Sequence, residues 1–379
     1  MKLLRVEAFA LSCPIPGAFQ VRLGIGRTVK RDAVLVKITG EDGYVGWGEA
    51  HAGRAPTVIA ELIHSTLAPL LVGAELEEHA ALWHKLYRLQ LASHGTGAAA
   101  ALAISGIDMA LWDLRGKLAG QPLYALLGGA SRSIPAYAGG ISFGYGETGE
   151  LVEEAQAAQA SGYRALKLRL GLEADADLAR VTAVRAALGN EIDVLTDANC
   201  SYSLDAARRV RAGLDDLAAG WLEEPFPAHD FRRYRALAGC GRTLLAAGEN
   251  HYLLADFDRL ADDGVVRIWQ PDLSKCGGLS EALRIAALAS EHGIAIHPHT
   301  SVTGLNVAAS LHFLAAVSNA GYFEADFARY NPLRTELTRP VAALQGDGGF
   351  LPPSGAGLGV EVDEAALRHY PAVPGAGYL

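Results

Sequence analysis

The chain has few cysteines and no excess of positive charge. Its four cysteines, Cys13, Cys200, Cys240 and Cys276, stand far apart and form no CxxC pair, which argues against a disulfide framework and indicates a reduced cytoplasm as the compartment. The 33 Lys and Arg against 42 Asp and Glu give a formal net charge of −9. This balance argues against nucleic acid or an anionic membrane surface as the partner.

Long apolar runs are missing as well. No uninterrupted stretch of ~18 apolar residues is present, so we expect no transmembrane helix. The opening MKLLRVEAFAL is interrupted by Glu7 and lacks a clear small-residue cleavage site, so it predicts a first strand rather than a signal peptide. What remains is an ordinary globular composition, with half of the 379 residues hydrophobic, which is enough for a large core.

The first 128 residues predict an α+β domain. Up to about residue 50 the pattern alternates as in antiparallel strands, and EDGY at 41–44 marks a hairpin turn. From 55 to 127 the apolar spacing becomes helical, and Gly120 ends the last long helix. We therefore expect a separate domain, 1–128, with the hairpin first and the helices after it.

Residues 129–334 show a different pattern, in which short β-rich runs alternate with Ala-rich helical stretches about eight times. Such alternation is typical of a (β/α)8 barrel of the TIM type. Beyond it, residues 335–379 are extended and rich in Gly and Pro, without a core pattern of their own. We expect this tail to pack back on the first domain.

From the second predicted barrel strand onward, one ionisable side chain stands at the end of each strand, at intervals of 23 to 30 residues. These side chains are Lys167, Asp197, Glu223, Glu249, Asp272, His299 and Glu324. A βα unit takes roughly 30 residues, so the groups recur once per unit and meet at the C-terminal edge of the barrel, where such barrels place their chemistry. Taken singly, a carboxylate after a strand is more often a helix N-cap.

Three of these carboxylates, on Asp197, Glu223 and Glu249, end consecutive strands. They would repel one another unless a cation lay between them. Carboxylate oxygens with open positions suit a hard divalent ion, Mg²⁺ above all. Only His297 and His299 stand at a spacing that zinc could use, so the sequence predicts a magnesium site.

Several motifs carry a family resemblance that runs through nearly the whole chain in order. SGIDMALWDLRGKLAGQPLYALLGG, LKLRLG, TDAN, WLEEPF, GEN, PDLSKCGG and HPHT resemble the enolase superfamily, in its mandelate racemase branch. The resemblance implies a capping α+β domain over a modified (β/α)8 barrel, one Mg²⁺ per subunit, a small carboxylate substrate and a homo-oligomer. It also implies that cap loops, here around 13–30 and 50–55, select the substrate.

The resemblance assigns roles to residues. The metal ligands fall on Asp197, Glu223 and Glu249, with Glu224 interpreted as an ion-paired neighbour of Glu223. The catalytic His–Asp dyad falls on His299 and Asp272. The muconate-lactonizing branch shares SKCGG but carries a catalytic Lys at the position of Asp272, which favours the mandelate racemase branch.

The remaining candidates concern the substrate. Glu324 matches an acid that hydrogen-bonds the substrate carboxylate, and Asn199 is expected to contact the substrate or a metal ligand. Lys275 matches a common family residue and is a substrate-binding candidate, with a structural role as the alternative. His51 follows WGEA and either reaches the substrate or is a solvated loop residue.

One position departs from the family pattern. The family usually has Lys-x-Lys on the second strand, whereas this chain has Lys167 and Arg169. Arg stays protonated and is a poor proton acceptor, but its guanidinium is a good clamp for a carboxylate or an anionic intermediate. We therefore expect Lys167 and Arg169 to stabilise charge, not to accept the proton.

These assignments predict a lyase that removes the proton α to a carboxylate and forms an enediolate. With His299 as the only competent base, dehydration of a hydroxy acid or acid sugar is favoured, because one His can serve first as base and then as acid. A racemase, epimerase or lactone cycloisomerase on the same site is the alternative. A zinc hydrolase using His297 and His299, or a binding protein without catalysis, are more distant alternatives.

Overall fold

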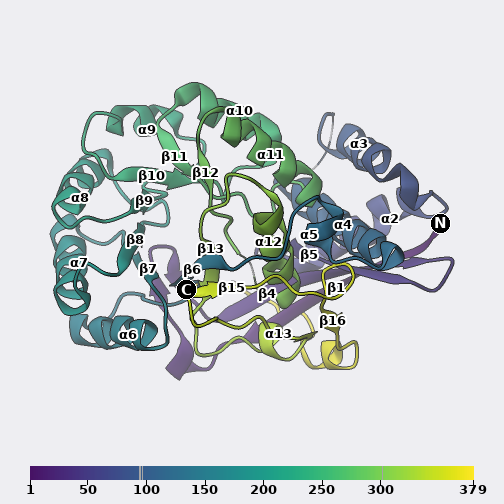
Figure 1. The fold of residues 1–379 in the computed structure, drawn as a ribbon, viewed down its shortest axis with the longest axis horizontal. Helices are drawn as coiled ribbons and strands as arrows, with labels where there is room; N and C mark the ends of the chain where they lie inside the picture. The colour runs from purple at the N-terminus through teal and green to yellow at the C-terminus, as the bar shows by residue number, and fades with distance from the viewer. Residues whose placement is uncertain (94, 96, 301) are drawn as a thin grey trace.

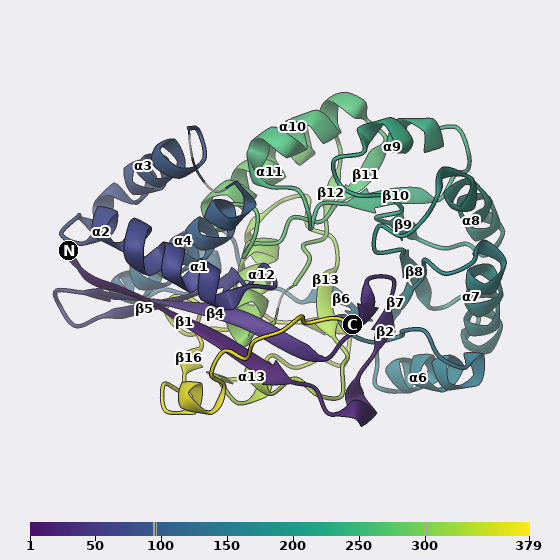
Figure 2. The same cartoon turned by 180° about the vertical axis from the view of Figure 1, so that it is seen from behind.

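The computed structural model describes residues 1–93, 95, 97–300 and 302–379. Figure 1 shows two parts: a barrel ringed by the teal and green helices, and beside it the purple and blue N-terminal strands and helices. The yellow C-terminal tail runs back over the N-terminal strands, as Figure 2 shows from behind. The predicted class, a (β/α)8 barrel with an α+β cap, is confirmed.

The cap is built on a three-stranded antiparallel sheet in the order β1 (Leu3–Pro14), β4 (Lys30–Gly40), β5 (Val45–His51). The β4–β5 register pairs Thr39 with Val45, so the predicted hairpin turn at 41–44 is confirmed. Between β1 and β4 the chain forms a second, small hairpin of β2 (Arg22–Leu23) and β3 (Gly26–Arg27). This small hairpin becomes part of the site described below.

Helices cover the cap sheet. They are α1 (Pro56–Leu62), α2 (Ala68–Leu71), α3 (His79–Gln90), α4 (Ala98–Ala119) and α5 (Leu123–Leu126). The Ala-rich α4 buries most of its residues and lies close to β5. A Cβ at Gly48 would stand 2.2 Å from the carbonyl oxygen of Gly106, so only glycine allows this approach. Gly120, with φ +63°, ends α4 as predicted.

Within the described residues, eight parallel strands form the curled barrel sheet. They are β6 (Ile134–Gly139), β7 (Ala165–Arg169), β8 (Asp193–Asp197), β9 (Trp221–Glu223), β10 (Leu244–Ala247), β11 (Val266–Trp269), β12 (Ala295–Ile296) and β13 (Phe323–Asp326). The strands follow chain order, and β13 pairs with β6. Ile296 joins β12 to the segment ahead of β13 by hydrogen bonds with Asn319 and Gly321, which closes the ring.

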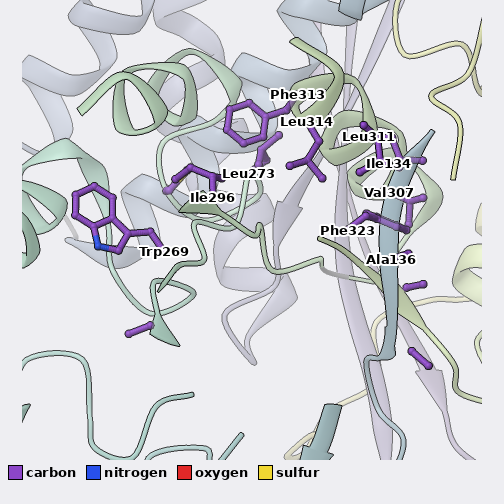
Figure 3. Close-up of a cluster of buried hydrophobic side chains, with 14 of the residues drawn as sticks. Ile134, Ala136, Trp269, Leu273, Ile296, Val307, Leu311, Phe313, Leu314 and Phe323 are labelled. Carbon is purple, nitrogen blue, oxygen red and sulfur yellow. The ribbon is translucent and has the colours of Figure 1, made fainter. Parts of the chain in front are cut away.

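The barrel helices lie outside the strands. They are α6 (Thr148–Ala160), α7 (Ala174–Leu188), α8 (Leu204–Asp216), α9 (Phe231–Leu237), α10 (Leu253–Asp263), α11 (Leu279–Glu291) and α12 (Gly304–Ala316). Their apolar faces and the strands bury one continuous core; Figure 3 shows the part where Val307 and Leu311 of α12 lie near Ile134, Ala136 and Phe323. Inside the barrel a smaller cluster, including Tyr137, Leu195 and Trp221, fills the space along the barrel axis.

The tail after β13 contains α13 (Pro332–Thr335), β14 (Thr338–Arg339), β15 (Gly349–Phe350) and β16 (Glu361–Val362). It contacts the cap at several points: the Lys37 ammonium lies 2.6 Å from Glu364, and the amide of Leu358 donates to Asp113 on α4. In the part of the chain that the structure describes, no helix combines the length and apolarity needed to cross a membrane.

Candidate active site

A buried lysine joins the ends of several barrel strands. The Lys167 ammonium on β7 lies 2.9 Å from Glu223 Oε1, 3.0 Å from Glu324 Oε1 and 3.8 Å from Asp197 Oδ2. Asp197 and Glu223 are direct partners in the β8–β9 register. Burial opposes the charge, but Glu223 and Glu324 raise the pKa of Lys167 well above its ordinary value. The structure therefore brings these four predicted residues together, with Lys167 as a permanent cation.

Arg169, two residues further on β7, holds the other side of Asp197. Its guanidinium contacts the Asp197 carboxylate and the carbonyl oxygen of Gly140. The Asp197 carboxylate also accepts hydrogen bonds from the backbone and side chain of Asn199, at 2.8 and 3.1 Å. Despite burial, Asp197 raises the pKa of Arg169 further, so Arg169 cannot act as a base.

The Asn199 amide oxygen is buried without a hydrogen-bond partner, in a residue that is 9% exposed. Asn199 also has φ +43°, a conformation that asparagine tolerates better than most residues. A buried acceptor without a donor costs free energy. A ligand or ion in the adjoining pocket would satisfy it; the contact predicted for Asn199 stays a prediction.

The predicted His–Asp dyad is formed. His299 Nδ1 lies 2.7 Å from Asp272 Oδ2, and its Nε2 lies 3.1 Å from Glu249 Oε2. The other Asp272 oxygen accepts hydrogen bonds from Ser274 and Asn306, which fixes the carboxylate. Burial opposes the charge on His299, but Glu249 and the bond to Asp272 raise its pKa to about 9. With Nδ1 donating to Asp272, Nε2 is the nitrogen that can accept a proton.

Lys275 and His51 complete the predicted set. The Lys275 ammonium lies 3.8 Å from Glu249 Oε1. His51 ends β5, and its Nδ1 accepts a hydrogen bond of 3.0 Å from the amide of Gly53. Burial and the nearby Lys275 lower the pKa of His51 to about 3. His51 is thus a neutral, oriented side chain, not a freely solvated one.

A cavity of about 220 Å³ opens between the strand ends, the cap and the tail. Of the predicted site residues, the lining includes His51, Arg169, Asn199, Glu249, Lys275 and His299. Lys167, Asp197, Glu223, Asp272 and Glu324 do not line it, and all are nearly fully buried. The predicted residues thus form two layers, one against the cavity and one behind it.

Glu224 is a site residue that sequence reasoning misplaced. The structure puts no cation within ion-pair distance of it among the described residues; instead both its oxygens accept from Asn250 and one accepts from Cys200. It lines the cavity and has φ +37°, which is costly for glutamate. Its interpretation as an ion-paired neighbour of Glu223 was wrong. Only the doubled acid in WLEEPF could have pointed to it.

The donor chemistry of the site fits a divalent cation. Carboxylates outnumber cations there: Asp197, Glu223, Glu224, Glu249, Asp272 and Glu324 face Lys167, Arg169, Lys275 and His299. Burial, with Asp197 nearby, raises the pKa of Glu223 to about 7 although Lys167 opposes this. Among the described residues no three acidic, His or Cys side chains are already gathered around one point. Instead, Asp197 forms an ion pair with Arg169, and Glu249 forms one with His299. A metal would compete with these cations for the carboxylates.

Comparisons with known proteins show which proteins the chain is similar to. The chain is 34% identical over 357 residues to D-galactarolactone cycloisomerase of Agrobacterium fabrum, covering 90% of this chain and 92% of that protein. It is also 34% identical over 351 residues to D-galactonate dehydratase of Ralstonia nicotianae, covering 88% and 90%.

Solved structures are similar over the full length. An enolase superfamily member from Polaromonas sp. JS666 has a TM-score of 0.97 at 52% identity, covering all of both chains. A racemase from Streptomyces coelicolor A3(2) with bound magnesium has a TM-score of 0.88 at 28% identity, covering 97% of this chain and 99% of that one.

Family models match both parts of the chain. Residues 6–128 match the mandelate racemase / muconate lactonizing enzyme N-terminal domain, and residues 150–366 match the enolase C-terminal domain-like family. The chain is an enzyme of the mandelate racemase / muconate lactonizing enzyme family within the enolase superfamily.

Proposed function

We propose that this enzyme removes the proton α to the carboxylate of an acid sugar and then expels the β-hydroxyl group as water. The observation that carries this proposal is the charge state of the groups in the site. His299 is oriented through Nδ1 by Asp272, and its Nε2 lies 3.1 Å from Glu249, which helps to raise its pKa to about 9. A cation bound to Glu249 would weaken this pairing and leave Nε2 as the proton acceptor, whereas Lys167 and Arg169 stay protonated. A site with one base favours elimination, since racemisation needs a competent base on each face of the substrate.

Asp197, Glu223 and Glu249 would hold one Mg²⁺ per chain. The ion supplies a Lewis acid that stabilises the enediolate charge when bound. The support is the donor chemistry: oxygen ligands on consecutive strand ends, an excess of carboxylates, and an unsatisfied Asn199 oxygen beside them. Glu223 stays the proposed ligand on the family pattern, with Glu224 facing the cavity beside it.

The chain's own residues account for the proton and the charge. His299 Nε2 takes the α-proton as the C–H bond breaks, and Lys167 and Arg169 stabilise the developing negative charge. The carbon–carbon double bond then forms while the β C–O bond breaks, and His299 returns its proton to the leaving hydroxyl as water. The resulting enol becomes a 2-keto-3-deoxy acid, so no oxidant or second substrate is needed.

Ring opening of a lactone or cyclic ether is a second candidate. It is favoured by the similarity to a protein named as a D-galactarolactone cycloisomerase, at the same identity as the dehydratase. The first proton transfer is the same. If the β-oxygen belongs to a ring, its C–O bond breaks without loss of any atom, so the product has the mass of the substrate.

The test is a screen of acid sugars and their lactones with Mg²⁺ in deuterated water, followed by mass spectrometry. Dehydration gives a product lighter by one water, and cycloisomerisation gives one without that loss; both incorporate solvent deuterium when the product ketonises. Exchange of the α-proton with inversion and without elimination would instead support a racemase. If no acid shows exchange or product, the proposed function is wrong.

A further inference from the structure

The outer wall of the cavity comes from the cap and the C-terminal tail. Residues 377–379 run beside the small β2–β3 hairpin: the Arg27 amide donates to Leu379 O at 2.7 Å, the Leu379 amide to Arg27 O at 2.9 Å, and the Val29 amide to Gly377 O at 2.9 Å. Figure 2 shows the yellow tail reaching this hairpin from along the purple strands. The hairpin and the tail therefore form one hydrogen-bonded unit over the cavity.

Arg54 and Tyr378 meet on this outer wall. The Arg54 guanidinium carbon lies 5.0 Å from the centre of the Tyr378 ring, within the range of a cation–π contact. Arg54 has φ +63°, a strained conformation for arginine, and follows Gly53, whose amide donates to His51. The turn thus holds Arg54 at the cavity, at a cost in backbone energy.

The other cations of the outer wall have carboxylate partners. Lys30 lies 3.1 Å from Asp32, and Arg31 lies 3.4 Å from Asp326. Arg54 has no carboxylate within 4.0 Å among residues 1–93, 95, 97–300 and 302–379. An arginine stacked on a ring keeps its N–H edges available for a bidentate bond to an oxyanion.

Arg54, Tyr378 and His299 line the same cavity, so one ligand can reach both the base and the outer wall. We propose that the substrate is a dicarboxylic sugar acid, or its monolactone, whose distal carboxylate binds Arg54. Tyr378 is a positioning residue that holds the guanidinium. This inference rests on the proposed function, since the proximal carboxylate is the one that acidifies the α-proton at His299.

A matched pair of substrates tests the inference. A hexaric acid and the hexonic acid of identical configuration differ only at C6, which is a carboxylate in one and a hydroxymethyl group in the other. We measure kcat and KM with Mg²⁺, α-proton exchange in deuterated water, and binding by calorimetry. Arg54→Gln removes the charge, and Arg22→Gln is the control, because Arg22 is exposed on the β2–β3 hairpin but does not line the cavity.

Arg54→Gln should weaken binding and raise KM for the hexaric acid by roughly 10- to 100-fold, the range of a charge-assisted hydrogen bond. It should change the hexonic acid by less than about two-fold, with kcat little affected, and Arg22→Gln should change neither. Tyr378→Leu should raise KM for the hexaric acid by a smaller factor. Tyr378→Phe should leave this KM as in the unaltered enzyme, because the ring is kept.

Two results distinguish a failure of this inference from a failure of the proposed function. If both acids are dehydrated or exchanged alike and Arg54→Gln affects them equally, Arg54 is only a solvated rim residue and the distal-carboxylate inference fails while the function stands. If neither acid exchanges its α-proton, the function fails. Calorimetry still decides the inference in that case, since equal affinity of both acids for the unaltered enzyme overturns it.

Discussion

The two walls of the cavity are built in opposite ways. On the barrel wall, Lys167, Glu223 and Glu324 are nearly fully buried, and each has more than one charged or hydrogen-bonding partner. On the cap wall, Arg54 is exposed and Tyr378 is half-buried, and their side chains contact each other. Strand ends in a barrel hold side chains rigidly, whereas surface loops tolerate change. On the proposed function, we expect the reaction to depend on the barrel wall and substrate selection to depend on the cap wall.

Removal of the metal should have the largest effect and tests the role proposed for the barrel wall. Dialysis against EDTA should reduce turnover of every accepted acid to background, because the enediolate loses its main electrostatic stabilisation. Added Mg²⁺ should restore activity, and Ca²⁺, which prefers longer bonds and more ligands, should restore less. Full activity in protein shown by elemental analysis to be metal-free would contradict the assignment of Asp197, Glu223 and Glu249.

Replacement of the base should have the next largest effect. His299→Asn should lower turnover by ~10²–10⁴-fold and abolish α-proton exchange, since general-base catalysis contributes about that much. The loss should appear in kcat and be the same for every substrate, unlike the substitutions on the cap wall. His84→Asn, at an exposed position on α3, is the control. Exchange at the unaltered rate in His299→Asn would assign the proton transfer to Lys167.

Arg169→Lys tests the departure from the family pattern. The lysine keeps a positive charge but loses the fork that bonds Asp197 and Gly140 together, so we expect a fall in kcat of roughly 10- to 100-fold. NMR of the recovered substrate should show whether α-proton exchange with inversion has appeared. Arg232→Lys, on an exposed site of α9, should behave as the unaltered enzyme. Unchanged kinetics in Arg169→Lys would show that the fork is dispensable.

The smallest predicted effect is on the stability of the protein, through the contact between the C-terminal tail and the buried His312. His312 Nδ1 accepts from the Tyr124 amide and Nε2 donates to the carbonyl of Leu358, both at 3.1 Å, and burial lowers the pKa of His312 to about 4. The unfolded state then binds the proton more readily, so stability is complete above about pH 6.5 and falls towards pH 4. Each pH unit changes it by at most about 1.4 kcal/mol.

His312→Gln can keep both hydrogen bonds without titrating. We expect its unfolding midpoint, followed by circular dichroism, to fall less between pH 7 and pH 5 than that of the unaltered protein. Other histidines with lowered pKa values, His51, His251 and His297, will leave part of the slope. An identical slope in both proteins would show that His312 does not contribute.

The barrel wall could be predicted from the sequence because its spacing is fixed by geometry. One βα unit per strand sets the intervals between residues such as Asp197 and Glu223, and the parallel register then brings their side chains together. The His299–Asp272 dyad followed from the family pattern and is formed. Whether these side chains hold a metal stays a prediction, since they are paired with Arg169, Lys167 and His299.

The cap wall could not be predicted, for two physical reasons. The contact of Tyr378 with Arg54 joins residues more than 300 positions apart, and no periodicity links a tail to a loop. The backbone conformations of Arg54 and Glu224 have positive φ, which no sequence signal demands of Arg or Glu. The sequence therefore left two roles open for His51, a substrate contact or a solvated loop residue. In the structure its ring accepts a hydrogen bond from the turn that presents Arg54.

The order of the strands has a consequence for how new specificities can arise. Every residue proposed for proton transfer and metal binding lies between Lys167 and Glu324, in one uninterrupted stretch of the chain, because the barrel strands follow chain order. The residues of the cap wall lie outside that stretch, before residue 55 and after 376. Two recombination crossovers near residues 140 and 330 would thus exchange one substrate preference for another between related genes while the reaction itself is inherited intact.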